Sequence, residues 1–117
     1  MAAGVWRDLD AFGTYKGIRA QAQAEFLTLP TEAAGLFLQA GAIAEKYATP
    51  DIAAWQYNNA AKALIEYFKT NKVERQALLI TAREYLATAE KLDATNQKIK
   101  SNIDFCEFWI KAFSLRK

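Results

Sequence analysis

Apolar residues recur at steps of three and four along most of this chain, which is the period of a helix that buries one face. The clearest stretch predicts two long amphipathic helices, Thr49 to about Thr70 and Asn71 to about Leu92. Their apolar positions are Ala53, Tyr57, Ala60, Ala61, Leu64 and Phe68 in the first helix, and Leu78, Ala82, Tyr85, Leu86, Ala89 and Leu92 in the second. Because neither stripe is stable in water alone, we expect the two helices to fold back on each other as an antiparallel hairpin.

Capping residues mark where these two helices begin. Thr49-Pro50-Asp51 combines a capping hydroxyl, a proline at the first helical position and a carboxylate in the first turn. Asn71 and Glu74 have the spacing of a capping box, in which each side chain bonds the backbone of the other residue. They predict that the second helix of the hairpin begins at Asn71.

The first half of the chain predicts two more helices. Thr14 can N-cap a helix from Tyr15 to about Leu27. Pro30 ends it, because the residue before a proline is pushed out of the helical region, and Thr31 then caps the next helix. The buried positions of these two helices are expected to be Tyr15, Ile18, Ala22, Phe26, Leu29, Leu36, Phe37, Ala40, Ile43, Ala44 and Tyr47.

Two glycines lie inside the second of these helices. Gly35 and Gly41 each weaken it by about 1 kcal/mol relative to alanine. They indicate either positions where a neighbouring backbone comes close or glycines tolerated in a helix that packing holds.

The last predicted helix runs from about Asn96 to Leu115, after the break at Asp93 to Asn96. Its regular buried stripe consists of Ile99, Ile103, Cys106, Ile110 and Phe113, and further apolar area comes from Phe105, Phe108, Trp109 and Ala112. One terminal helix rarely buries so much within its own chain. Either the apolar residues of segment 1–13 (Val5, Trp6, Leu9 and Phe12) cover part of it, or it forms an interface.

These patterns predict an all-α fold of five antiparallel helices in a single domain, residues 1–117. The length of 117 residues suits one hydrophobic core. No segment of strand length alternates with a period of two. The helices either stack as hairpins of a repeat or close as a compact bundle.

Composition excludes most catalytic and metal chemistry. The chain has no histidine, one cysteine and five scattered glycines, which removes the commonest general base and zinc ligand and any glycine-rich phosphate loop. Cys106 lies among apolar residues, so we expect a buried, inert thiol. The carboxylate pairs Asp8/Asp10, Glu45/Asp51 and Asp104/Glu107 suit a solvated surface better than acid–base work. We therefore predict no enzyme activity, no cofactor and no metal.

Charge indicates neither nucleic acid nor membrane. The net charge is +2, with −2 in residues 1–60 (four Lys and Arg, six Asp and Glu) and +4 in residues 61–117 (eleven and seven). Acidic residues are interleaved with the cations of the basic half, as on a solvated helix face. No segment approaches the roughly 20 apolar residues that a membrane span needs. We expect a cytoplasmic protein.

Two adjacent asparagines, Asn58 and Asn59, lie in the middle of a strong predicted helix, although asparagine is a mediocre helix former. One interpretation is that they bond a packed neighbour or face water. The other is that they line a groove and hold the main chain of a bound peptide, because a side-chain amide both donates and accepts hydrogen bonds. Asn59 shares its face with Trp55, four residues earlier.

Two segments within residues 50–103 resemble a tetratricopeptide repeat. The segment Trp55 to Leu64 is similar to the first helix of that motif, with a polar asparagine before small residues and a large one. The segment Ala82 to Asp93 is similar to the second helix, where small Ala82 and Ala89 flank bulky Leu86. The spacing departs from the family, because Pro50 to Asn96 spans about 45 residues where the repeat has about 34.

The resemblance implies peptide or protein binding on the inner face of the first helices. It carries that role to Asn58, Asn59 and Asn102 alone. We therefore expect a non-enzymatic protein–protein interaction module. The alternative is an assembly subunit that self-associates into a homo-oligomer through its C-terminal helix. The candidate partner-binding residues are Trp55, Asn58, Asn59, Lys62, Phe105, Phe108 and Trp109.

Overall fold

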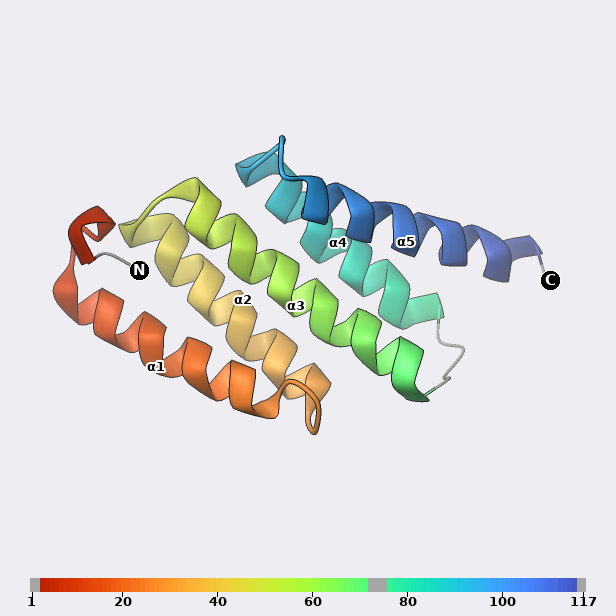
Figure 1. Ribbon diagram of the computed structural model, residues 1–117, viewed down its shortest axis with the longest axis horizontal. Helices are drawn as coiled ribbons and strands as arrows, with labels where there is room; N and C mark the ends of the chain where they lie inside the picture. The colour runs from red at the N-terminus through yellow and green to blue at the C-terminus, as the bar shows by residue number, and fades with distance from the viewer. Residues whose placement is uncertain (1–2, 72–75, 116–117) are drawn as a thin grey trace.

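The computed structural model describes residues 3–71 and 76–115. In chain order its elements are the 3-10 helix η1 (Ala3–Val5) and the helices α1 (Leu9–Glu25), α2 (Pro30–Tyr47), α3 (Pro50–Asn71), α4 (Gln76–Leu92) and α5 (Gln97–Leu115). The described residues contain no strand. The predicted all-α fold of five helices is confirmed (Figure 1).

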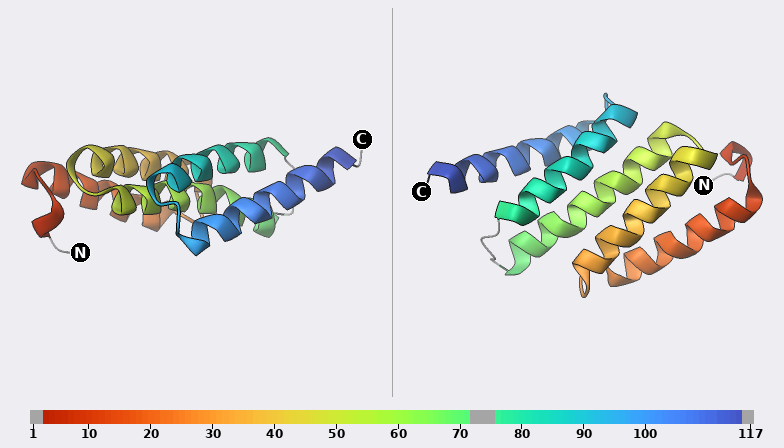
Figure 2. Two further views of the ribbon diagram at one scale, coloured as in Figure 1. Left: turned by 90° about the horizontal axis from the view of Figure 1, so that it is seen from above. Right: turned by 180° about the vertical axis from the view of Figure 1, so that it is seen from behind.

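The helices lie side by side in chain order and successive helices run antiparallel (Figure 1). Helices that follow one another in the chain pack against each other, and α3 also contacts α5. The views in Figure 2 place α1 and α5 at opposite ends of this row. The molecule is therefore elongated, measuring 50 × 30 × 16 Å.

Helix α3 forms the centre of the core, because it is covered by α2 on one side and by α4 and α5 on the other. Its buried residues are Ala53, Ala54, Gln56, Asn58, Ala60, Ala61, Ala63, Leu64, Ile65 and Phe68. Five of these are alanines, whose small side chains let the neighbouring helices approach closely. The predicted stripe is buried, apart from the partly buried Tyr57. The apolar pattern did not predict burial of the polar Gln56 and Asn58.

Gly41 marks a close contact between α2 and α3. A Cβ atom at position 41 would lie 3.1 Å from ring carbons of Tyr57, whereas a Cβ at Gly35 meets no atom within 4 Å. The Tyr57 hydroxyl donates a 2.9 Å hydrogen bond to Glu45. Burial, with a smaller effect from Glu45, raises the pKa of Tyr57 to about 12. Of the two glycines, only Gly41 lies where a neighbouring helix comes close, and the atoms it meets belong to a side chain rather than to a backbone.

Helix α1 begins earlier than predicted. Asp8 is its N-cap residue and accepts a 2.9 Å hydrogen bond from the backbone N–H of Ala11. The prediction that Thr14 caps this helix is wrong, because the Asp8 carboxylate already satisfies a first-turn donor and the helix continues through Thr14. Trp6 is 6% exposed and packs its ring on Phe12 and Tyr15, with centroids 5.2 and 4.7 Å away.

Prolines open the next two helices. Pro30 is the first residue of α2, and its N-cap residue, Leu29, makes no side-chain hydrogen bond. Leu29, the residue before Pro30, lies outside the helical region as predicted. The prediction that Thr31 caps α2 is wrong, because Pro30 already occupies the first helical position, where its missing N–H costs little. The predicted start of α3 at Pro50 is confirmed. There the Thr49 hydroxyl donates to Asp51, and this bond holds the pKa of Asp51 below its usual value.

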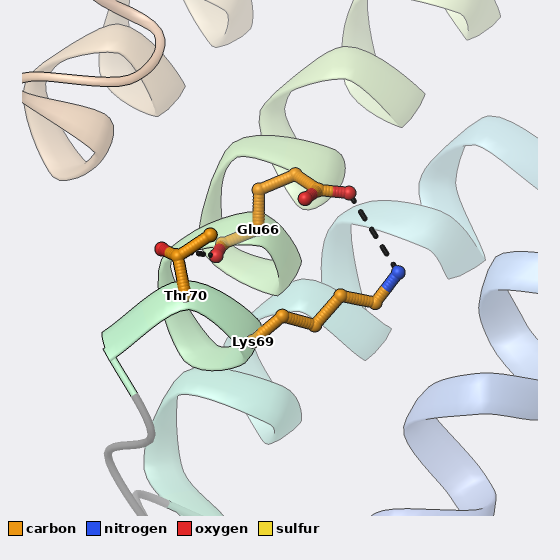
Figure 3. Close-up of polar contacts among 3 residues, drawn as sticks. All are labelled: Glu66, Lys69 and Thr70. Carbon is orange, nitrogen blue, oxygen red and sulfur yellow. Dashed lines mark hydrogen bonds and ion pairs between the residues drawn. The ribbon is translucent and has the colours of Figure 1, made fainter.

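Polar contacts between neighbouring residues stabilise the C-terminal end of α3 (Figure 3). The Thr70 hydroxyl donates a 2.8 Å hydrogen bond to the backbone oxygen of Glu66, whose carboxylate lies 3.7 Å from the Lys69 ammonium. Asn71 is the last residue of α3, and its side chain donates to the backbone of Tyr67. It therefore does not begin the next helix. Its predicted capping partner, Glu74, lies outside the described residues.

Helix α5 begins as predicted, because the Asn96 side chain accepts hydrogen bonds from the backbone N–H groups of Lys98 and Ile99 at 2.9 and 3.2 Å. The predicted stripe of this helix is buried, apart from the partly buried Ile110. Segment 3–7 does not cover its remaining apolar area. That segment lies at the other end of the row (Figure 1), where the Arg7 backbone donates to Tyr47.

Candidate functional site

The site predicted on α3 is a surface hollow between α3 and α5. It has a volume of about 200 Å³ and is lined by Trp55, Asn58, Asn59, Lys62, Lys98, Ser101 and Asn102. All four candidate residues of α3 therefore line the same hollow. The opposite wall belongs to the first turns of α5, which lie beside the middle of α3 although the sequence separates them by more than one helix.

Two further hollows continue this one along α3. Asn59 and Lys62 also line a hollow of about 500 Å³, which is completed by Gln23, Phe26, Leu27 and Phe37. Trp55 also lines a hollow of about 300 Å³, which is completed by Tyr15, Arg19, Asp51, Ile52, Gln56, Asp93 and Asn96. Neighbouring hollows share these side chains, so the three lie next to one another along α3. We call them together the α3 groove.

Two hydrogen bonds between helices, one buried and one partly buried, fix polar atoms of the α3 groove. Asn58 is 2% exposed and accepts a 2.9 Å hydrogen bond from the side-chain amide of Asn102 on α5. Gln56, also 2% exposed, donates a 2.9 Å hydrogen bond to the hydroxyl of Tyr15 on α1. Burial raises the pKa of the Tyr15 hydroxyl, which is fully buried. These hydrogen bonds satisfy polar groups whose burial without a partner would destabilise the fold. They also hold α1, α3 and α5 in register.

The remaining polar side chains of the groove keep hydrogen-bonding capacity for another molecule. Asn59 is half-buried, and one contact of its amide is a long hydrogen bond of 3.4 Å to Gln56. Lys62 and Lys98 are exposed, and the Lys98 ammonium lies 5.8 Å from the ring centroid of Trp55. An amide, two ammonium groups and an indole face therefore border the same hollow.

Charge differs along the α3 groove. The hollow between α3 and α5 carries the cations Lys62 and Lys98. The hollow at the start of α3 carries Asp51 and Asp93 opposite a single cation, Arg19. The Arg19 Nε atom is buried and has no hydrogen-bond partner within the described ranges. The middle of the groove is thus basic, and its end at the start of α3 is predominantly acidic.

The three other candidate residues lie on α5, away from the α3 groove. Phe105 and Trp109 are partly buried and pack edge-on against Phe68 of α3, with ring centroids 6.2 and 5.7 Å away. Phe108 is 66% exposed and contacts Trp109, with centroids 5.5 Å apart. Phe105 and Trp109 therefore belong largely to the core, and only Phe108 presents most of its ring to solvent.

The described part of the chain offers little support for a metal site, a reactive cysteine or a membrane-spanning helix. No group of three or more His, Cys, Asp or Glu side chains there is arranged to hold a metal ion. Cys106 is buried as expected, and burial raises the pKa of its thiol to about 11, which disfavours the reactive thiolate. Glu107 pairs with Arg83 of α4 at 3.1 Å rather than with Asp104. None of the helices described is long and apolar enough to cross a membrane.

Comparison with known protein families, with curated proteins and with solved structures gave no match. The site therefore rests on its geometry.

Several residues of the α3 groove were not predicted from the sequence, among them Arg19, Gln56, Lys98 and Ser101. Asn102, which the tetratricopeptide resemblance had singled out, is the α5 residue that bonds Asn58. For the others the sequence carries no signal, since which residues of α1 and α5 face α3 depends on how the helices pack.

Proposed function

We propose that this protein is a non-enzymatic protein–protein interaction module, built from tetratricopeptide-like helices, that binds an extended peptide segment of a partner in the α3 groove. The observation that carries the proposal is the hydrogen bond between buried Asn58 and half-buried Asn102, which helps to form the wall of a surface hollow rather than closing it. A side chain fixed in this way needs no rearrangement when a partner arrives, which lowers the entropic cost of binding.

The amides of the groove suit the main chain of an extended peptide. Such a segment presents unpaired N–H and C=O groups in alternation. The Asn59 side chain both donates and accepts, so it can pair with a peptide group of either kind. The Trp55 ring offers apolar area beside this polar contact.

The charges of the groove favour a segment with opposite charges at its two ends. Asp51 and Lys62 are 62 − 51 = 11 residues apart on α3, which is about 16 Å along a helix axis. An extended peptide covers that distance in about five residues. The preferred segment therefore carries an acidic side chain near Lys62 and Lys98, and a basic side chain about five residues away near Asp51.

A library of random linear peptides displayed on phage tests this proposal. Peptides that the wild-type protein selects are synthesised, and their dissociation constants are measured by isothermal titration calorimetry. Asn59→Ala is expected to weaken binding about fivefold, since one net hydrogen bond contributes about 1 kcal/mol, with an almost unchanged melting temperature. Gln39→Ala, which removes an exposed amide from α2 outside the α3 groove, is the matched control.

Selected peptides that combine acidic and basic side chains, together with a loss confined to Asn59→Ala, would support the proposal. If Asn59→Ala unfolds the protein, the asparagine has a structural role. If both variants bind like the wild type, or if the library yields no peptide, the α3 groove is not a peptide site.

A further inference from the structure

One face of α5 is exposed along most of the helix. Asp104, Phe108, Lys111 and Leu115 follow one another at steps of four, three and four residues, so they share a face. All four are exposed, with Phe108 at 66% and Leu115 at 77%. We call this face the α5 stripe. It is separate from the face that carries Ile99, Ile103 and Cys106, which are buried in the core.

The charged members of the α5 stripe have no ion-pair partner elsewhere in the described ranges. Asp104 and Lys111 both face solvent, and neither forms an ion pair there. The neighbouring acid Glu107 is held by Arg83 at 3.1 Å. One carboxylate and one ammonium therefore lie seven residues apart on either side of an exposed phenylalanine.

This order is self-complementary under a two-fold axis. The midpoint of Asp104 and Lys111 falls between Glu107 and Phe108, so the two charges are equidistant from it along the helix. When two copies of α5 pair antiparallel about that midpoint, each Asp104 lies opposite the other copy's Lys111. The two Phe108 rings then meet beside the axis, which is the isologous arrangement of a symmetric dimer.

The same pairing covers Leu115. Under this symmetry Leu115 lies opposite Lys100 of the second copy, because the two positions are also equidistant from the midpoint. Lys100 is exposed, and its aliphatic stem can cover a leucine while its ammonium group stays in water. The location of α5 at one end of the row leaves this face accessible to another molecule (Figure 2).

We propose that the protein forms a symmetric homodimer in which the α5 stripes of two copies pack antiparallel, with each Asp104 paired to the other copy's Lys111. The occupant of this face is thus a second copy of the chain. The proposal does not depend on the function of the α3 groove.

Sedimentation velocity from about 10 µM to about 1 mM tests the proposal, since this range suits a modest interface. The wild type is expected to shift from monomer to dimer. Asp104→Lys places two like-charge pairs in each dimer and is expected to weaken dimerisation about tenfold, the effect of about 1.4 kcal/mol. Lys111→Asp is expected to have the same effect, while Asp104→Lys combined with Lys111→Asp restores the dimer with its charges exchanged.

Two further variants separate association from folding. Glu84→Lys, an acid-to-base change at an exposed position of α4, is the matched control and is expected to dimerise like the wild type. Phe108→Glu is expected to be monomeric. Circular dichroism melting of every variant is expected to match the wild type at low concentration, because each changed side chain is exposed.

A wild type that stays monomeric at the highest concentration would overturn the proposal. A dimer that Phe108→Glu leaves intact would overturn it as well. A double charge exchange that fails to restore association would refute the antiparallel pairing of Asp104 with Lys111.

Discussion

The α3 groove and the α5 stripe are two surfaces of one small helical protein that are built in opposite ways. In the α3 groove, buried polar side chains already have partners on other helices, as in Asn58 with Asn102 and Gln56 with Tyr15. On the α5 stripe, large apolar side chains such as Phe108 face solvent. The two buried amides of the first surface are paired without an occupant, whereas the apolar area of the second is covered only on association.

The two surfaces therefore contribute to stability at different stages, one on folding and the other on association. Buried hydrogen bonds of the α3 groove contribute to folding, so removing one should cost stability before any partner is considered. Burial of the α5 stripe contributes only on association, so changes there should leave the isolated chain unaffected. Stability measurements therefore distinguish the two surfaces without a known partner.

The greatest loss of stability is expected from a substitution in the α3 groove. Asn58→Ala removes a buried acceptor and leaves the Asn102 amide without its partner, so it should lower the free energy of unfolding by about 1–3 kcal/mol. Urea unfolding monitored by circular dichroism measures this change. Asn59→Ala is the adjacent control and should lower it by less than about 0.5 kcal/mol. Equal losses in the two variants would mean that the Asn58 bond contributes nothing special to the fold.

The next prediction concerns the pH dependence of stability, which Cys106 controls on the buried face of α5. Burial raises the pKa of the Cys106 thiol from 9.0 to about 11, so the unfolded chain loses this proton at a lower pH than the folded chain does. The stabilisation is complete below about pH 9 and is lost as the pH rises towards about 11.

Urea unfolding at about pH 8 and about pH 10 should therefore show a loss of about 1 kcal/mol in the wild type. Cys106→Ala should show a smaller loss over the same interval, because it lacks the buried thiol whose pKa is raised in the folded chain. An equal loss in both proteins would show that the thiol does not control this pH dependence.

The smallest effect lies outside both surfaces, in the α2 glycines. Gly35→Ala adds a methyl group that meets no atom within 4 Å, so it should stabilise the protein by about 0.5–1 kcal/mol. Gly41→Ala should stabilise it less or destabilise it, because the new Cβ lies 3.1 Å from the Tyr57 ring. Thermal melting of the two variants makes the comparison. A larger gain from Gly41→Ala would show that the Tyr57 ring moves aside freely.

Local signals in the sequence were enough for most of the fold. Pro50 and Asn96 marked helix starts correctly, because their effects on helix termini depend on neighbouring residues alone. Thr14 misled the prediction, since a capping side chain also fits inside a helix when an earlier residue, Asp8, provides the cap. Burial of Gln56 was not predictable, because it depends on the Tyr15 hydroxyl that the packing of α1 places beside it.

In the candidate site too, features set within one helix were predictable, whereas features that depend on the packing of several helices were not. The residues predicted on α3 line one hollow, since a helix fixes which of its own positions share a face. The contributions of α1 and α5 could not be predicted, because they depend on the order and crossing of separate helices. The predicted aromatic group on α5 was divided by packing, with Phe105 and Trp109 partly buried and Phe108 exposed.

Fluorine NMR of protein labelled with fluorotryptophan tests the central distinction most directly, because the three tryptophans report on three places. Trp55 lines the α3 groove, Trp109 contacts Phe108 beside the α5 stripe, and Trp6 is 6% exposed at the opposite end of the row. A peptide selected by the wild type should shift the Trp55 resonance alone, and raising the protein concentration should shift the Trp109 resonance alone. A peptide that shifts Trp109 and leaves Trp55 unchanged would contradict the account.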